Sequence, residues 1–184
     1  MRYILRTCEG RDQYIPYLTE NIKGLEICFD DVGGAMNNFL KSLEMAGNDP
    51  VVNIEDDIRL CNNFTDRVEA EIEKRPDSLI QFFSMRKADL VIGERWDSGG
   101  NYLMAQCTYI PAKMSAGILK FSEKYERLRH KSHPLDSMVA EYLKRAKQRY
   151  WIVVPNLVDH IIGKSAIDSR RASTNRQSFT FKGS

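Results

Sequence analysis

Hydrophobic and polar positions alternate in blocks along the first half of the chain, and these blocks predict strands and helices in turn. Short runs rich in β-branched and aromatic residues predict four strands, near residues 3–5, 25–29, 50–54 and 79–83. The segments between these runs are amphipathic. Met36, Phe39, Leu40 and Leu43, for example, fall at i, i+3, i+4 and i+7, the apolar stripe of a helix.

The repetition of strand and helix up to residue 83 predicts an α/β fold, with a mostly parallel central sheet and helices on both of its faces. The pattern changes after that point. Strand candidates at 90–92 and 102–110 flank a predicted loop with Trp96, Asp97 and Gly99, which we expect to form a lid over an acceptor. Further elements are predicted as two helices and a last strand, around 114–125, from Pro134 onward and at 151–154.

Composition places the chain among globular proteins. It has 184 residues, of which 42% are hydrophobic and 28% charged, so it is long enough to bury a core and too apolar to be disordered. Its apolar runs are far shorter than the ~20 residues that cross a bilayer, and its first residues lack the apolar region of a secretory signal. We therefore expect a cytoplasmic protein with no membrane partner, whose four dispersed cysteines are reduced.

The net charge of +2 conceals an uneven distribution. Residues 1–118 hold 13 Lys and Arg against 19 Asp and Glu, whereas residues 119–184 hold 14 against 6. The last third is therefore basic. It is either a solvated surface with a polar tail or a surface for a polyanion such as nucleic acid, and composition does not choose between these readings.

The segment VVNIEDDIRL carries the most chemical information. An apolar strand that stops at three carboxylates places them at the carboxyl edge of a parallel sheet, where open α/β folds bind ligands. Alternation along an extended backbone sends Glu55 and Asp57 to one side and Asp56 to the other. The segment is either a solvated acidic turn or, as its place at a strand end favours, part of a site for a divalent cation.

The order of these features resembles that of small glycosyltransferases of the GT-A class. Strand and E-D-D stand where that class has its D-x-D motif, and a later strand is followed by D-H-x-x-G-K-S. The resemblance implies a GT-A-like catalytic domain over residues 1–163 and a basic, polar C-terminal segment over 164–184. It also implies that Glu55, Asp57 and His160 bind a divalent metal, Mn²⁺ or Mg²⁺, on the diphosphate of a nucleotide sugar. Glu at the first motif position departs from the family pattern.

Further residues are candidates for the nucleotide-binding and catalytic positions. Lys164 and Ser165 follow His160 closely enough to donate to the same phosphates. Four more polar side chains near the first two strands are candidates for base, ribose or phosphate contacts: Arg6, Thr7, Arg11, Asp31. Asn38 is a fifth. Each of these has an ordinary alternative role on the protein surface or at a strand end.

Asp136 is the candidate catalytic base. It lies in the predicted first turn of a helix, and the resemblance places an acidic residue near there in some relatives, where it takes a proton from the acceptor hydroxyl. A carboxylate at that position is also what a favourable interaction with the helix dipole selects. His160 has a similar alternative, as a hydrogen-bonded histidine at a strand exit.

These features favour a metal-dependent glycosyltransferase that moves a sugar from a nucleoside-diphosphate sugar to a hydroxyl. The small size and basic last third resemble bacteriophage DNA-modifying sugar transferases, which makes a hydroxymethylated base in DNA a possible acceptor and the host cytoplasm the expected location. Two alternatives remain, a non-catalytic nucleic-acid-binding module and a nucleotidyltransferase. The sugar, the nucleotide, the stereochemical course and the oligomeric state are not encoded in any pattern that we can read.

Overall fold

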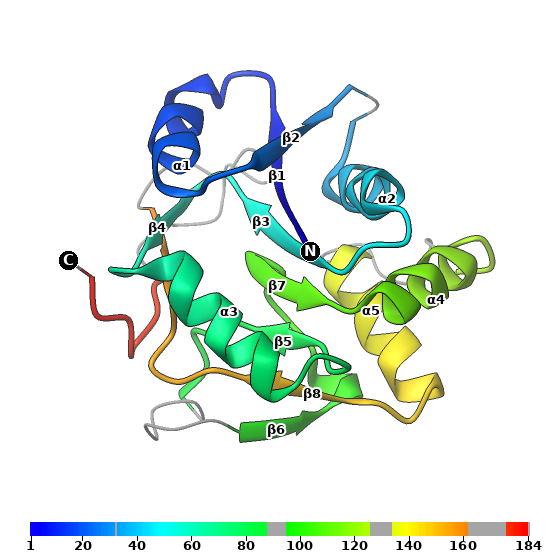
Figure 1. Cartoon of the computed structure of the whole chain (residues 1–184). Coiled ribbons are helices and arrows are strands. Elements are labelled where there is room, and N and C mark those ends of the chain that lie inside the picture. The colour runs from blue at the N-terminus through cyan, green and yellow to red at the C-terminus, as the bar shows by residue number, and fades with distance from the viewer. Residues whose placement is uncertain (32, 88–94, 126–133, 162–175, 184) are drawn as a thin grey trace.

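The computed structural model describes residues 1–31, 33–87, 95–125, 134–161 and 176–183 (Figure 1). The strands are β1 (Arg2–Cys8), β2 (Leu25–Asp30), β3 (Val51–Glu55), β4 (Ile58–Leu60), β5 (Ile80–Gln81), β6 (Arg95–Ser98), β7 (Cys107–Ile110), β8 (Arg149–Ile152) and β9 (Val158–His160). The helices are α1 (Ile15–Asn21), α2 (Ala35–Ala46), α3 (Phe64–Lys74), α4 (Ala112–Ser122) and α5 (Pro134–Arg145). Short 3-10 turns precede α1 and follow β6, at Asp12–Tyr14 and Gly99–Asn101.

The central sheet has seven strands in the order β2-β1-β3-β7-β5-β8-β6. β1 pairs in parallel with both β2 and β3, and β5 pairs in parallel with β8. β7 lies antiparallel between β3 and β5, and β6 lies antiparallel at the edge beside β8. Five strands therefore run in one direction and two in the other, which confirms the prediction of a mostly parallel sheet.

Alternate residues of each buried strand point to opposite faces of the sheet and build two separate cores. Leu5 and Ile54 belong to the core that α1 and α3 cover. Ile4 and Val51 belong to the core that α2, α4 and α5 cover. Figure 1 shows these two groups of helices on the two sides of the sheet, so the expected layering is confirmed.

The predictions of single elements were most accurate where a periodic hydrophobic pattern extended over many residues. Met36, Phe39 and Leu43 are buried on one face of α2, and Pro134 opens α5 as expected. The interpretation of Trp96 as a loop residue was wrong, because residues 95–98 form the edge strand β6. The predicted strand at 90–92 lies outside the described residues.

The segment after Trp96 is fixed rather than lid-like. Gly99 is buried so closely against α5 that an added Cβ would lie 2.4 Å from the Cβ of Leu143. Asp97 is also held, by an ion pair with Arg86 at 2.9 Å. The residues that were expected to form a lid therefore lie in a packed turn at the edge of the sheet farthest from β2.

A small second sheet brings residues 158–160 next to the end of β3. β4 pairs antiparallel with β9, and His160 is the partner of Ile58, one residue beyond Asp57. The segment after this sheet is anchored at residues 178–181. The Asn156 Oδ1 accepts hydrogen bonds from the hydroxyls of Ser178 (2.7 Å) and Thr180 (2.8 Å), and Phe181 packs against the core.

In the part of the chain that the structure describes, no helix has the length and apolar character needed to span a bilayer. All four cysteines are free, and three of them are buried, in agreement with the expectation of reduced thiols.

Candidate functional site

A cavity of about 100 Å³ lies at the carboxyl ends of β1, β2 and β3. This is where the topology of an open α/β sheet leaves a crevice between strand ends and the helices that follow them. Most of the residues that line it are polar or charged. Its lining consists of Arg6, Thr7, Cys8, Arg11, Asp30, Ala35, Asn38, Glu55, Asp56, Asp57 and Arg176.

The three adjacent acids all face this cavity, each with its own cationic or hydroxyl partner. Asp57 Oδ2 accepts a hydrogen bond from Arg11 Nη2 at 2.6 Å, and Arg11 Nε lies 3.2 Å from Asp56 Oδ1. Glu55 instead lies 3.1 Å from Arg6 Nη2. The expected alternation ends at Glu55, because β3 ends there and residues 56–57 bend out of the strand.

The surroundings of Asp56 shift its pKa. Burial raises its pKa to about 6, while the hydrogen bond from the Thr7 hydroxyl (2.7 Å) and the charge of Arg11 oppose that rise. The neighbouring carboxylates Asp57 and Glu55 add to the rise. A buried row of like charges next to arginines is a typical arrangement for a site that exchanges internal partners for a charged ligand.

His160 lies directly against Asp57. Its Nε2 is 3.3 Å from Asp57 Oδ2, and its Nδ1 is 2.7 Å from the carbonyl oxygen of Ile161. Since a carbonyl only accepts, Nδ1 carries the proton that it donates. In a neutral ring Nε2 is then the acceptor, and it contacts Arg176 Nη2. His160 is not part of the described lining, but in this tautomer its acceptor nitrogen, the one that a metal ion would use, faces Asp57 and Arg176, which do line the cavity.

Arg176 was not predicted from the sequence. It enters the cavity from the C-terminal segment, whose anchoring is reinforced by the hydrogen bond from the Ser178 amide to Asp159 Oδ1 at 2.7 Å. Arg176 lies far along the chain from the other lining residues, in a stretch rich in Ser, Thr and Asn that indicated only a tail. The basic excess of the last third was the one signal that pointed to it.

Arg6 is a buried organiser of the cavity wall. Its guanidinium donates to Asn53 Oδ1 at 2.5 Å and to the carbonyl oxygen of Ala105 at 3.0 Å, in addition to Glu55. With 4% of its surface exposed, it has little freedom to follow a ligand. Its role in the geometry is to fix Glu55 against the residues just before β7.

Asn38 and Thr7 form the opposite wall. Asn38 Nδ2 donates to the Thr7 carbonyl at 3.0 Å, and its Oδ1 lies 3.0 Å from Cys28 Sγ. Asp31, the other residue predicted for this part, is exposed and paired with Lys41 at 2.9 Å, outside the cavity lining. Asp30 lines the cavity instead, and its carboxylate accepts the amides of Gly33 and Gly34, both at 2.8 Å.

Asp136 lies in the first turn of α5, close to the Arg6–Glu55 pair. Burial raises its pKa to about 6, and the Glu55 carboxylate adds to that rise. Backbone amides of Met104 and Ala105 and the charge of Arg6 oppose it. It is absent from the described lining of the cavity and adjoins the site through Glu55 and Arg6, which do line it. Lys164 and Ser165 lie outside the described residues.

A divalent cation fits part of this arrangement. Among the described residues, no three His, Cys, Asp or Glu side chains are gathered as a ready metal-binding group. Asp57 and His160 do adjoin each other, whereas Glu55 is held by Arg6. Mg²⁺ and similar ions commonly use one or two protein ligands together with phosphate oxygens. The donor set therefore suits an ion that binds with a phosphorylated ligand.

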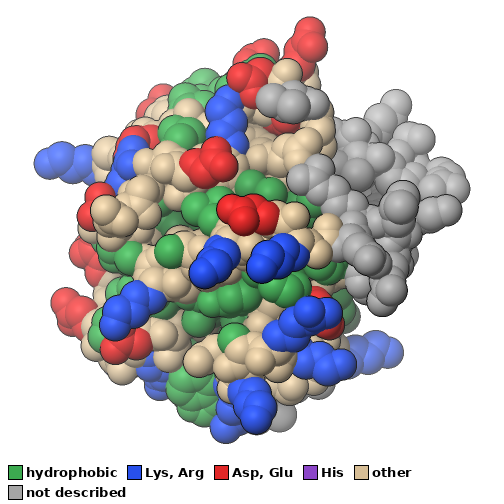
Figure 2. Space-filling view, turned by 90° about the vertical axis from the view of Figure 1, so that its right-hand side faces the viewer, with side chains coloured by type: hydrophobic (Ala, Val, Ile, Leu, Met, Phe, Trp, Pro, Cys, Tyr) green, Lys and Arg blue, Asp and Glu red, His purple; other side chains and the backbone are tan. Residues whose placement is uncertain are grey.

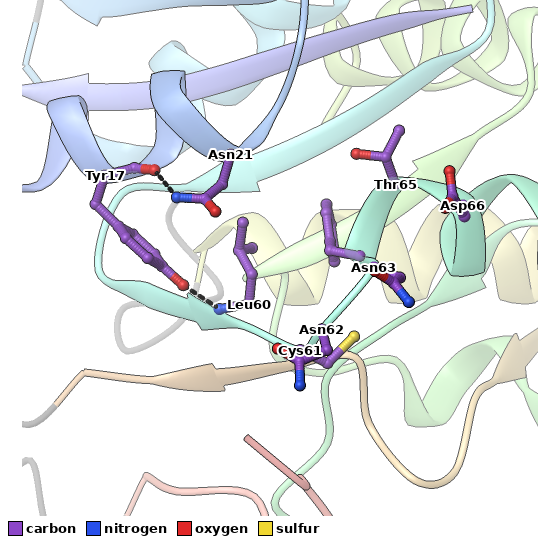
Figure 3. A pocket seen from close by; sticks show the side chains of 9 residues that line it. Tyr17, Asn21, Leu60, Cys61, Asn62, Asn63, Thr65 and Asp66 are labelled. Carbon is purple, nitrogen blue, oxygen red and sulfur yellow. Dashed lines mark hydrogen bonds between the residues drawn. The ribbon is translucent and has the colours of Figure 1, made fainter. Parts of the chain in front are cut away.

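A second cavity, of about 370 Å³, lies between α1 and the start of α3 (Figure 3). The Tyr17 hydroxyl accepts a hydrogen bond from the Leu60 amide at 3.0 Å on one side, and three asparagines line the rest. Of the described residues that line it, Asp66 alone carries a charge. The cavity offers no cation to a phosphorylated ligand, so the carboxyl-edge cavity is the stronger candidate.

No protein-family model matches the sequence, and no curated protein matches it either. Solved structures do match the fold. A197 from STIV is 15% identical, with a TM-score of 0.52, over 99% of this chain and 95% of that one. An apo UDP-glucose pyrophosphorylase is 9% identical, with a TM-score of 0.50, over 83% of this chain and 72% of that one. At these identities the likeness concerns the fold, which this chain shares with an enzyme named for a nucleotide sugar.

Proposed function

We propose that this protein is a glycosyltransferase that binds a nucleoside-diphosphate sugar in the carboxyl-edge cavity and moves the sugar to an acceptor hydroxyl. The observation that carries the proposal is the Asp57–His160 contact, flanked by the guanidinium groups of Arg11 and Arg176. Anionic and cationic groups at one strand edge suit a ligand that brings both phosphates and a metal ion. The likeness in fold to UDP-glucose pyrophosphorylase supports a nucleotide-sugar ligand.

Arg11 and Arg176 are the proposed diphosphate ligands. Both reach the cavity on flexible stems and now contact Asp57 and His160. Guanidinium groups bind phosphate oxygens in pairs, with charge-assisted hydrogen bonds about twice as strong as neutral ones. A bound diphosphate would therefore offer both guanidinium groups paired, charge-assisted hydrogen bonds in place of these internal contacts.

Asp57 and His160 are the proposed protein ligands of a divalent cation, Mn²⁺ or Mg²⁺. A carboxylate suits either ion, and the imidazole nitrogen favours Mn²⁺. When bound, the ion supplies charge neutralisation to the departing diphosphate. Glu55 was expected to join them, but among the described residues no third potential ligand is gathered with Asp57 and His160, so Glu55 is a weaker candidate.

The nucleoside is proposed to lie against the hydrogen-bonded pair of Thr7 and Asn38, where the lining is neutral. Asp30, rather than Asp31, is the carboxylate nearest to a ribose in that position, since it lines the cavity. Asp136 is the proposed general base. A carboxylate with a pKa of about 6 is mostly ionised at neutral pH and still basic enough to take a proton from a hydroxyl.

The acceptor is a saccharide or a hydroxymethylated base in DNA. The basic last third supports the second, because nucleic acid binding draws mainly on contacts between cations and phosphates. A DNA acceptor would require the base to leave the stack to reach the donor sugar.

A nucleotidyltransferase is the second candidate, since the UDP-glucose pyrophosphorylase shares the fold. One local feature favours the glycosyltransferase. Sites for nucleoside triphosphates commonly cradle the phosphates in a glycine-rich loop at a helix N-terminus. Here the connection after β1 contains one glycine, Gly10, before Arg11, and the amides of Gly33 and Gly34 before α2 already donate to the Asp30 carboxylate.

A thermal-shift screen of nucleoside diphosphates, triphosphates and nucleotide sugars, each with and without Mn²⁺, tests the proposal. We expect one nucleoside diphosphate and its sugar conjugate to stabilise the protein, and Mn²⁺ to enlarge the shift. Product analysis then separates the two enzymes, because a glycosyltransferase releases a nucleoside diphosphate and a nucleotidyltransferase releases pyrophosphate. Absence of a shift with every nucleotide would refute both.

A further inference from the structure

A shallow hollow of about 540 Å³ lies at the other end of the molecule from the candidate site. One side consists of β6 and the turn after it, and the other of the end of α5 and the start of β8. The lining residues are Trp96, Asp97, Ser98, Gly99, Lys144, Lys147, Gln148 and Arg149.

The sheet topology separates this hollow from the carboxyl-edge cavity. β8 runs in the same direction as β3, so its first residue, Arg149, lies at the amino edge of the sheet. β6 is the edge strand on the side away from β2. The elements that line the hollow and those that line the candidate site are thus at opposite edges along the strands and at opposite ends across the sheet; Figure 1 shows these elements at the lower right and at the top.

The hollow is positively charged. Lys144, Lys147 and Arg149 are exposed, and among the described residues none of these three has a carboxylate within ion-pair distance. Asp97 does not offset them, since its oxygens are held by Arg86 and by Asn101 Nδ2 at 2.9 Å. In Figure 2, which shows the side with α2, α4 and α5, Lys and Arg side chains gather in the lower half of the view.

An exposed tryptophan lies in the same hollow. Trp96 has 38% of its surface exposed, although it packs edge-to-face on Trp151 with ring centroids 4.7 Å apart. The guanidinium carbon of Arg149 lies 5.6 Å from the Trp96 ring centroid. The ring is therefore fixed by its neighbour and accompanied by a cation, a combination that stacks well on a nucleobase.

We infer that this hollow binds single-stranded nucleic acid. Lys144, Lys147 and Arg149 contact successive phosphates, and a base stacks on Trp96. An open, shallow, basic surface with one fixed aromatic ring is the arrangement by which proteins hold single strands without reading their sequence. An acidic peptide would satisfy the cations but would leave the aromatic ring without a stacking partner. The inference does not depend on the proposed transferase activity, because the two sites share no residue.

Fluorescence anisotropy of a labelled oligothymidylate of 20 nucleotides, titrated with the full chain over a series of salt concentrations, tests the inference. We expect affinity to fall linearly with salt on logarithmic axes. The double variant Lys147→Glu, Arg149→Glu should bind at least tenfold more weakly and lower the slope by about 1.4, since each lost contact with a single strand removes about 0.7.

The matched control is Lys23→Glu, Lys182→Glu, which changes the net charge equally at exposed positions elsewhere. An equal loss of affinity in both double variants would overturn the inference, because it would reduce the effect to overall charge. Trp96→Leu should weaken binding about tenfold at constant salt. Circular dichroism checks that each variant folds.

A polyglutamate competitor of equal charge tests the other class of partner. Displacement of the oligonucleotide by polyglutamate at equal charge concentration would identify an acidic-peptide surface instead and overturn the inference. Failure of the wild-type chain to bind oligothymidylate at low salt would overturn it as well, and would leave the nucleotide-sugar proposal untouched.

Discussion

The carboxyl-edge cavity and the basic hollow differ in how their charged side chains are paired. In the cavity, Asp56, Asp57 and Glu55 each face a guanidinium group at 2.6 to 3.2 Å. In the hollow, Lys144, Lys147 and Arg149 face solvent, and no described carboxylate lies within ion-pair distance of them. The carboxylates of the cavity are thus paired with arginines, whereas the cations of the hollow have no carboxylate partner among the described residues.

This difference implies two kinds of binding. Paired, buried charges act over short distances and respond weakly to salt, because solvent and counterions do not reach them. A ligand must replace their present partners one for one, which favours a ligand of defined shape and charge. Unmatched surface cations act over about 8–10 Å at ordinary ionic strength and favour any flexible polyanion. The following variants test that contrast.

The largest effect is expected from Asp57→Asn. The change removes the carboxylate that faces both His160 and Arg11, and with it the charge that would hold the metal ion. We expect sugar transfer to fall by more than about 100-fold, measured as release of nucleoside diphosphate at saturating Mn²⁺. Binding of oligothymidylate to the hollow should not change.

Asp66→Asn is the matched control, since Asp66 is an exposed carboxylate on α3 outside the carboxyl-edge cavity. Full turnover in Asp57→Asn would contradict the metal assignment. For the partner ligand, His160→Ala should raise the Mn²⁺ concentration needed for half-maximal activity, and an unaltered titration would remove His160 from the set.

Asp136→Asn should lower turnover by about 10²–10⁴-fold with donor binding retained, because the variant lacks a general base. Since a base acts as its carboxylate, wild-type turnover should fall as the pH drops through about 6, the pKa to which burial raises Asp136. A stopped assay over pH 5 to 8 measures this. Weakened donor binding in the variant would indicate a structural role instead.

Arg176→Ala should weaken nucleoside-diphosphate binding about 10- to 100-fold, since a hydrogen bond to a charged group contributes about 1.5–3 kcal/mol. Isothermal calorimetry with and without Mn²⁺ measures the change. Lys182→Ala, an exposed cation of the same segment, serves as the control. Equal affinities of Arg176→Ala and wild type would exclude the guanidinium from the phosphate site.

The smallest effect concerns stability. The pKa of Asp136 is raised in the folded state, so its contribution to stability is present at low pH and is lost as the pH rises through about 6. Asn resembles the protonated side chain. A rise of about two pKa units corresponds to about 2–3 kcal/mol, so the melting temperature of Asp136→Asn relative to wild type should increase by about 5–10 °C between pH 4 and pH 7. A constant difference over that range would contradict the raised pKa.

The helices and strands with a clear hydrophobic pattern, in the first part of the chain, could be predicted from the sequence. The stripe of α2 and the runs that form β1 to β3 specify which face each residue buries, and these elements carry the acids to the strand edge. β6 could not be predicted in this way. Trp96 and Gly99 suggested a loop, and only pairing with β8 and packing on α5 make that stretch a strand and a tight turn.

The candidate site was predictable to the same extent. Asp57 and His160 are brought together by the β4–β9 pairing, as their order in the chain suggested. Arg176 could not be predicted, because its position depends on hydrogen bonds between Ser178, Asp159 and Asn156 that no local pattern encodes. The internal pairing of Arg11 with two adjacent acids is likewise a product of tertiary structure.

The anchoring of residues 178–181 on Asn156 and the core has a practical consequence for handling the protein. The seven strands are complete before Val153, so a protease that cuts just ahead of Arg176 would leave the sheet whole and remove only Phe181 from the packing around one core. Circular dichroism of such a clipped sample would resemble that of the intact chain, although its cavity would lack Arg176. Mass spectrometry of the intact chain is therefore the right check before any ligand measurement.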